Sequence, residues 1–283
     1  MWIPVLAAAL LTSSLPAQIK ILAIENAASY MPGLPEPGSV ATVFCTGLSG
    51  IQGVITPSSQ FPFPQQLAGV GASINGGPAP ILAVADAGTY QQINIHVPPE
   101  RILKEAATVS VNQAGLSVSI PGVSYPPTAG LFADAQGAAV AVRVADGTSI
   151  SPQNPAHAGE MIAVYGTGFG ATYPPKPVGF PAPVAPVFAG PNDFVTSNTT
   201  TNVAGPARQL ILGQTATSVS MVSLVPGLAG VDQAAFQIPL GQAPGVTTLK
   251  VVSGSFVCQP PPFATSCTFQ ANAASNTVNL PIR

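Results

Sequence analysis

The sequence predicts an all-β protein of two consecutive β-sandwich units, and three observations support this fold class. A stretch of eleven residues occurs twice, apolar residues alternate with polar ones over short segments, and turn-forming residues separate these segments. The 283 residues include 32 prolines and 28 glycines, spread along the chain, which would interrupt any long helix. Short strands tolerate this spacing, and about seven strands in about a hundred residues is typical of a sandwich.

The repeated stretch covers residues 38–48 (GSVATVFCTGL) and 159–169 (GEMIAVYGTGF). Residues two apart on a strand point to one face, so each copy is predicted to be a strand with an apolar face. The Thr-Gly pair near its end predicts a turn that returns Leu48 or Phe169 to the core. Neither copy has the spacing of a phosphate-binding loop, which also needs a helix behind it. The repeat therefore indicates two related structural units.

The N-terminus has the pattern of a secretory signal. Residues 2–11 are apolar, and small residues follow as far as Ala17. This length is too short to span a bilayer, and it fits a signal peptide over residues 1–17, cleaved near Ala17. We expect a secreted or cell-surface protein, with the periplasm as an alternative location. Retention of the signal as an anchor stays open.

Charge and hydropathy exclude two classes of partner. The chain has 8 Lys and Arg, 10 Asp and Glu, a net charge of −2 and no basic cluster, so we expect no binding to nucleic acid. Mean hydropathy is +0.42. After the signal, however, no run of about 18 apolar residues occurs, so no membrane-spanning segment is expected.

The first unit is predicted over residues 18–125. Hairpin turns are expected at 75–77 and 112–115, where Asn and Gly favour tight turns. Besides the repeated strand, we expect strands over residues 19–24, 69–75, 79–85, 90–97, 108–112 and 116–120.

A second internal match pairs residues 92–98 (QINIHVP) with 233–239 (QAAFQIP). Alternation places Ile93 and Ile95 on the buried face and His96 on the opposite, outward face. The counterpart of His96 is Gln237, and no partner lies at ligand spacing. We therefore do not expect a catalytic or metal-binding histidine.

The second unit is predicted over residues 126–283, after a short proline-containing linker at 124–128. We expect a hairpin over 132–144, with Asp134 and Asp146 as turn formers rather than calcium ligands. A long loop is expected over 171–209. Strands are predicted to resume at residue 210 and to continue over residues 218–225, 234–238, 247–252 and 277–281.

Long loops of sandwiches often carry ligand contacts, so the 171–209 loop is the predicted ligand site. Its aromatic and amide side chains offer ring stacking and uncharged hydrogen bonds. An alternative is that the loop is a proline-stiffened cover over one end of the sandwich. The candidate ligand-binding residues are Tyr173, Phe180, Phe188, Asn192, Phe194 and Asn198.

The three cysteines divide into a pair and a single residue. Cys258 and Cys267 flank a short proline-rich loop, and in an exported chain they are the expected disulfide. Cys45 ends the first copy of the repeated strand, where we expect a buried, unreactive thiol.

Five separate motifs carry a resemblance to a known family: residues 26–30 (NAASY), 38–48, 75–79 (NGGPA), 92–98 and 275–281 (SNTVNLP). Together they resemble the uncharacterised Solibacter-type C-terminal domain family, found mostly at the ends of secreted acidobacterial proteins. The resemblance covers nearly all of the chain after the signal. It implies an immunoglobulin-like, export-associated module, and it implies no activity, cofactor or catalytic residue. Cys45 replaces the glycine that is usual in this family.

Two functional classes follow from these observations. The favoured one is an exported, non-catalytic module that binds an extracellular glycan or protein or assembles at the cell surface, without cofactor or metal. The alternative is a secreted carbohydrate-active hydrolase. Such an enzyme needs two carboxyl groups about 5–10 Å apart, whereas the acidic residues here occur singly in expected turns. The candidate acids of the alternative are Asp86, Glu100, Asp146 and Asp232.

Overall fold

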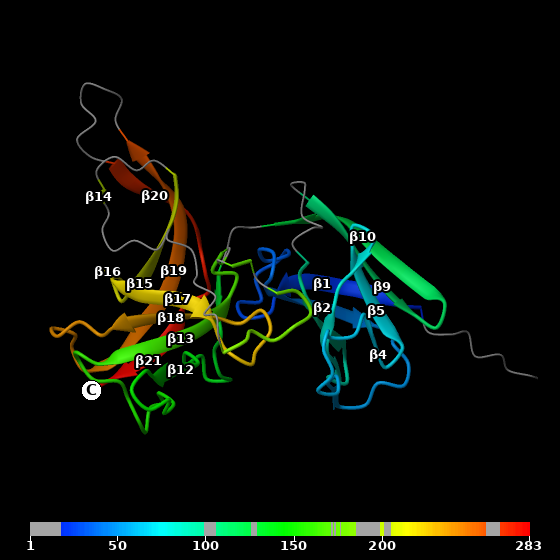
Figure 1. Ribbon diagram of the computed structural model, residues 1–283, viewed down its shortest axis with the longest axis horizontal. Coiled ribbons are helices and arrows are strands. Elements are labelled where there is room, and N and C mark those ends of the chain that lie inside the picture. Colours follow the sequence, from blue (N-terminus) through cyan, green and yellow to red (C-terminus); the bar gives the residue numbers. More distant parts are fainter. Residues whose placement is uncertain are drawn as a thin grey trace, which may run out of the picture.

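The computed structural model confirms the all-β fold class. It describes residues 18–98, 106–125, 129–170, 172, 174–175, 177–184, 199–200, 205–258 and 267–283, with backbone only at 199–200, 205–207, 256–258 and 267. Every regular element among these residues is a β-strand. Figure 1 shows two bodies side by side, one formed by the N-terminal strands and one by the C-terminal strands.

The first body consists of two antiparallel sheets, called here sheet A and sheet B. Sheet A has the order β1 (Lys20–Asn26), β2 (Val40–Thr46), β8 (Gln91–His96), β7 (Ile81–Asp86), β3 (Val54–Ile55). Sheet B has the order β10 (Leu116–Ser124), β9 (Ala106–Gln113), β5 (Val70–Ile74), β4 (Gln66–Leu67), and β6 (Gly77–Pro78) pairs with β5.

The second body repeats this plan with sheets C and D. Sheet C has the order β11 (Gly130–Leu131), β13 (Met161–Thr167), β18 (Asp232–Gln237), β17 (Val219–Leu224), and β12 (Ala141–Arg143) pairs with β13. Sheet D has the order β14 (Thr199–Thr200), β20 (Cys267–Ala274), β19 (Gly245–Cys258), β15 (Gly205–Leu212), β16 (Thr215–Thr217), and β21 (Val278–Ile282) pairs with β19.

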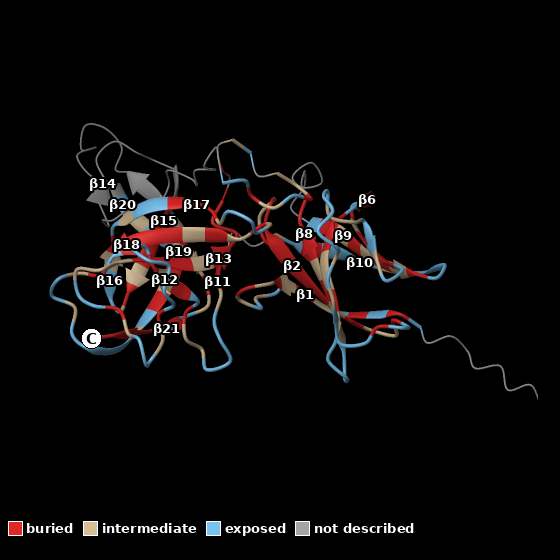
Figure 2. Cartoon of the chain, turned by 60° about the horizontal axis from the view of Figure 1, so that its bottom comes forward, coloured by how far each residue is buried: buried red, intermediate tan, exposed pale blue. Residues whose placement is uncertain are grey.

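Each pair of sheets encloses its own hydrophobic core. Val43, Ile93 and Val109 belong to one buried cluster, which draws residues from sheets A and B. Ile162 and Phe236 belong to a second cluster, which draws residues from sheets C and D. Figure 2 shows the buried residues concentrated on the strands and the exposed ones on the connecting loops. Alternation along each strand therefore divides the side chains between a dry interior and an outer face.

The internal repeat is visible in the strand register. Phe44 of β2 pairs with Gln92 of β8, and Tyr165 of β13 pairs with Gln233 of β18 in the same way. Both copies of the Thr-Gly turn use a glycine with positive φ, at +85° and +82°. The residue after each turn returns to the core, since Leu48 is 6% exposed and Phe169 is fully buried.

The expected hairpin turns are confirmed. Asn75 and Gly76 have φ values of 49° and 77°, and Ala114 and Gly115 have 50° and 82°. Positive φ at both central residues is typical of a type I′ turn, whose twist matches that of the flanking strands. The turns join β5 to β6 and β9 to β10.

The boundary predicted for the long loop is wrong at its C-terminal end. Strand β15 begins at residue 205 rather than 210, because it pairs over eight residues with the long strand β19. The expected hairpin over 132–144 is confirmed over residues 132–140, where Ala133 bridges Ala139 and the Val140 amide donates to the Phe132 carbonyl at 2.9 Å. From residue 141 the chain leaves this hairpin, and strand β12 pairs with β13.

The two bodies meet through buried hydrogen bonds between backbone and side chains. The hydroxyl of Thr167 accepts a hydrogen bond from the Val40 amide at 2.9 Å and donates one to the Gly230 carbonyl at 2.6 Å. A Cβ atom on Gly230 would lie 2.8 Å from Cγ2 of Val40, so the approach is close enough to require glycine. Arg208 forms an ion pair with Glu36 across the same joint.

Among the described residues, the structure has no helix of the length and apolar character that crossing a membrane requires.

Candidate functional site: an aromatic face on sheet A

The outer face of sheet A carries the candidate site. Alternation puts Thr42 and Phe44 of β2, and Gln92, Asn94 and His96 of β8, on the side that faces away from the core. At one end of this face His96 is buried at the joint with the second body. At the other end an open, shallow pocket of about 610 Å³ lies over the sheet.

We call this pocket, with the residues that line it, the aromatic face, because aromatic rings are its main feature. The ring centroids of Phe44 and Tyr90 lie 5.3 Å apart and those of Tyr30 and Phe44 lie 6.1 Å apart. Tyr30 is 57% exposed and Tyr90 is 38% exposed. Such exposure of neighbouring rings is uncommon unless the surface binds something. The lining residues are Leu22, Glu25, Tyr30, Phe44, Tyr90 and Gln92.

Local backbone geometry aims these side chains outward. Tyr30 lies in the turn after β1 with φ at 55°, and its amide donates a hydrogen bond to the Asn26 carbonyl at 2.9 Å. The Asn26 side chain stabilises this turn by accepting hydrogen bonds from two amides, at 2.9 and 3.2 Å. Leu22 occupies the register shift between Ile21 and Ala23, where a bulge redirects a side chain.

Polar groups beside the rings are ordered by a small hydrogen-bond network. Asn94 Oδ1 accepts hydrogen bonds from Thr42 Oγ1 at 2.9 Å and from Gln92 Nε2 at 2.8 Å. These contacts set the orientation of the Gln92 amide, with its carbonyl oxygen as the remaining acceptor. The pocket lining also includes the Glu25 carboxyl, whose pKa is raised by burial. Its polar side chains, apart from the two tyrosine hydroxyls, thus offer mainly hydrogen-bond acceptors.

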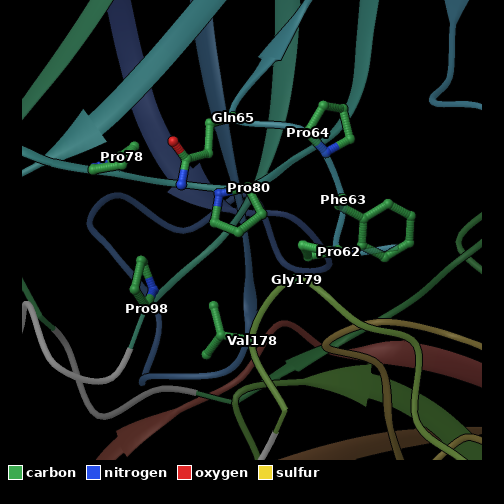
Figure 3. Close-up of a pocket in the computed structure, with 9 residues that line it drawn as sticks. All are labelled: Pro62, Phe63, Pro64, Gln65, Pro78, Pro80, Pro98, Val178 and Gly179. Carbon is green, nitrogen blue, oxygen red and sulfur yellow. The ribbon is translucent and has the colours of Figure 1, made fainter. Parts of the chain in front are cut away.

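A second pocket, of about 510 Å³, lies where the two bodies meet (Figure 3). The Phe63 amide donates to the Gly179 carbonyl at 2.6 Å, which ties this wall of the first body to the second. Val178 faces the proline rings from the other body. This pocket offers apolar ring surfaces and a single side-chain amide. Its lining is Pro62, Phe63, Pro64, Gln65, Pro78, Pro80, Pro98, Val178 and Gly179.

His96 lies on the outer face of β8, as alternation predicts. Alternation does not predict its burial: His96 is 1% exposed, because the second body covers this end of the face. The Gly179 amide donates to His96 Nδ1 at 3.1 Å, so the ring proton is on Nε2, which lies 3.0 Å from the Gly38 carbonyl oxygen. His96 is therefore a joint residue that holds the two bodies together.

The predicted ligand loop lies mostly outside the described residues. Phe180 is described and is 43% exposed, next to the joint. The other five candidates fall outside the description, so the loop stays a prediction. They are Tyr173, Phe188, Asn192, Phe194 and Asn198.

The cysteines agree with expectation where the structure describes them. Cys45 is a free, fully buried thiol, and burial raises its pKa to about 11, which makes it unreactive at neutral pH. Strands β19 and β20 place Cys258 directly opposite Cys267 in the register. Their side chains lie outside the description, and the disulfide stays a prediction.

The acidic residues that a hydrolase would use accept hydrogen bonds from backbone amides, wherever the structure describes them. Asp86 accepts from the Gly88 amide and Asp146 from the Thr148 amide, both at 2.9 Å. These contacts confirm Asp146 as a turn former, and hydrogen bonds from Thr148 lower its pKa. Asp134 likewise accepts from two amides of its own turn.

Asp232, the buried acid of that set, is 1% exposed and accepts from the Phe169 amide at 2.9 Å. This bond holds the second Thr-Gly turn against β18, which is a structural role. Glu100 lies outside the description. Within the described part of the chain, no three His, Cys, Asp or Glu residues are grouped so as to hold a metal ion.

No protein-family model matches the chain, and no curated protein shows significant sequence similarity to it.

Sequence reasoning missed the aromatic face because its parts come from distant segments. The outward position of Phe44 follows from alternation in β2, and that of Gln92 from alternation in β8. Alternation in the predicted strand over 90–97 puts Tyr90 on the same side as Gln92, whereas Tyr30 belongs to a turn, where no periodicity predicts direction. Only the pairing of β1, β2 and β8 in one sheet brings these side chains together.

Proposed function

We propose that the protein is an exported, non-catalytic binding module, immunoglobulin-like in fold, that binds an extracellular glycan through the aromatic face. The exposed cluster of Tyr30, Phe44 and Tyr90 on an ordered sheet is the observation that carries this proposal. The signal-like residues 1–17 and the resemblance to the Solibacter-type family support export, as separate arguments from the sequence.

The chemistry of the aromatic face suits a sugar. The apolar faces of a pyranose ring stack on exposed aromatic rings, while its hydroxyl groups need hydrogen-bond acceptors close by. Tyr30 and Tyr90 combine a ring face with a hydroxyl group. Gln92 and Glu25 add an amide oxygen and a carboxylate at the edge of the same pocket. A few polar groups around an apolar surface are typical of small-ligand sites.

The position of the carboxylates supports binding without hydrolysis. Glycoside hydrolysis uses two carboxyl groups flanking the scissile bond. The aromatic face has Glu25 as the single carboxyl group in its lining. Asp86, Asp146 and Asp232 instead accept hydrogen bonds from nearby backbone amides.

The test compares two exposed-aromatic sites on a glycan array. The double variant Tyr30→Ala/Tyr90→Ala should lose about fivefold to a hundredfold in affinity for the bound glycan, since each ring contact contributes about 0.5–1.5 kcal/mol. Phe180→Ala is the comparison variant, because it removes an exposed ring in the predicted ligand loop. Circular dichroism confirms that each variant is folded. Binding should depend weakly on salt, because the site has a single charge.

Three results would contradict the proposal. Loss of binding in Phe180→Ala with full binding in the tyrosine variant would place the site in the 171–209 loop. Absence of any glycan binding would remove the proposed ligand class. Glycan hydrolysis that disappears when Asp86, Asp146 or Asp232 is replaced would establish the hydrolase alternative.

A further inference from the structure

The rings of the aromatic face do not share a plane. Phe44 and Tyr90 meet edge to face with an interplanar angle of 79°, and Tyr30 is tilted from Phe44 by 41°. A solid polysaccharide presents many parallel chains as a flat surface, and stacking on it requires coplanar rings. Here a flat surface could stack on at most one ring at a time. The three rings instead form a bent wall that can contact a single chain on more than one side.

The volume and rigidity of the pocket fit the same ligand. Its volume of about 610 Å³ lies within the roughly 300–1,000 Å³ typical of small-ligand pockets. Phe44 and Gln92 are fixed in neighbouring strands, and Tyr30 is fixed in a turn stabilised by the Asn26 side chain. The ring angles are therefore set before binding, which favours one ligand shape over adaptation to several.

The charge of the site determines whether neutral or acidic polysaccharides bind. Among the six lining residues, Glu25 is the single charged group and none is basic. A uronate or a sulfated sugar would bring a negative charge close to this carboxylate, in a pocket that offers no positive charge to balance it. Sugar hydroxyl groups, in contrast, can donate to Glu25 and to the Gln92 carbonyl oxygen.

From these observations we propose that the aromatic face binds a single soluble chain of a neutral polysaccharide, and neither a solid polysaccharide surface nor an acidic chain. This inference rests on the proposed glycan-binding function and narrows its ligand class.

The experiment uses the full chain from residue 18 and defined probes. Isothermal titration calorimetry measures binding of soluble hexaoses of glucose (β-1,4 and α-1,4), xylose, mannose, N-acetylglucosamine and galacturonic acid. Sedimentation with insoluble cellulose and chitin measures binding to solid surfaces. We expect binding to at least one neutral hexaose, at least tenfold weaker binding to the galacturonate hexaose, and no retention on the solids.

Variants assign that binding to the site. Tyr30→Ala and Tyr90→Ala should each weaken binding of the neutral hexaose about two- to tenfold. Phe61→Ala should leave it unchanged, because Phe61 is an exposed ring outside the lining of the aromatic face. Glu25→Gln keeps the shape of the side chain and removes its charge. It should reduce the discrimination against the galacturonate hexaose, which a purely steric role of Glu25 would not do.

The outcomes separate this inference from the proposed function. Retention on cellulose or chitin without binding to any hexaose overturns the single-chain inference and leaves glycan binding intact. Tighter binding of the galacturonate hexaose than of every neutral one overturns the neutral-ligand inference. No binding to any soluble or solid glycan overturns both proposals, as does hexaose binding that neither tyrosine variant weakens.

Discussion

The buried hydroxyl of Thr167 should be the most sensitive single group at the joint between the two bodies. It accepts from the Val40 amide and donates to the Gly230 carbonyl, and Thr167 itself is fully buried. Thr167→Val keeps the shape of the side chain but removes both hydrogen bonds. The amide and the carbonyl would then stay buried without this partner.

The magnitude follows from the cost of two unsatisfied buried groups. Each contributes about 1–3 kcal/mol, so Thr167→Val should lower the free energy of unfolding by about 2–6 kcal/mol. Thr167→Ser retains the hydroxyl group and loses one methyl group, which should cost only about 1 kcal/mol. Thr46 is the repeat counterpart, half-buried at the opposite end of β2 from Val40, so Thr46→Val is the matched control.

Urea unfolding, followed by the far-UV circular dichroism signal of the β-sheets, measures these changes in stability. We expect the Thr167→Val transition to shift to lower urea or to split in two as the bodies uncouple, while Thr46→Val stays close to wild type. Equal stability of Thr167→Val and Thr46→Val, within about 0.5 kcal/mol, would refute the reasoning, because surface substitutions also change stability by that amount.

Three further predictions concern individual side chains. Arg143→Met should destabilise the second body by about 2 kcal/mol in thermal unfolding, since it breaks a 2.6 Å ion pair and leaves the partly buried Glu160 carboxylate with only its His157 contacts. The Cys45 thiol should resist iodoacetamide at neutral pH until the protein unfolds. Its pKa of about 11 leaves little thiolate, and burial blocks access; rapid native alkylation would contradict this. Non-reducing peptide mapping of exported protein should find Cys258 bonded to Cys267, with a contribution of about 2–3 kcal/mol from the closed loop; two free thiols there would show the pairing to be wrong.

Much of the fold could be predicted because local rules agree with one another. Gly76 and Gly115 adopt positive φ without steric cost, and Asn75 tolerates it, so these residues between alternating segments predict hairpin turns. Alternation predicts the buried face of β2 and β8. The early start of β15 could not be predicted in this way, because it depends on the length of a partner strand more than forty residues away.

The site and the joint were harder to predict for a related reason. His96 lies on the predicted face of its strand, but its burial depends on contact with Gly179 from the other body. Tyr30 and Phe44 are separated by a loop and meet only because β1 and β2 are neighbours in the sheet. Alternation of apolar and polar residues predicts which side of a strand faces away from the core of its own sandwich. It does not predict whether another part of the protein covers that side.

The shared outer face of sheet A limits how this protein can be divided. One end of that face carries the aromatic pocket, and the other end, with His96 and the Val40 amide, is covered by the second body. Excision of residues 18–125 as a stand-alone module would expose that covered end to water. It would remove the Thr167 hydroxyl from the Val40 amide and the Gly179 amide from His96 Nδ1. A transplantable version of the first body would therefore need a new polar surface at His96 and Val40, whereas the pair of bodies can be moved between fusion proteins as one piece.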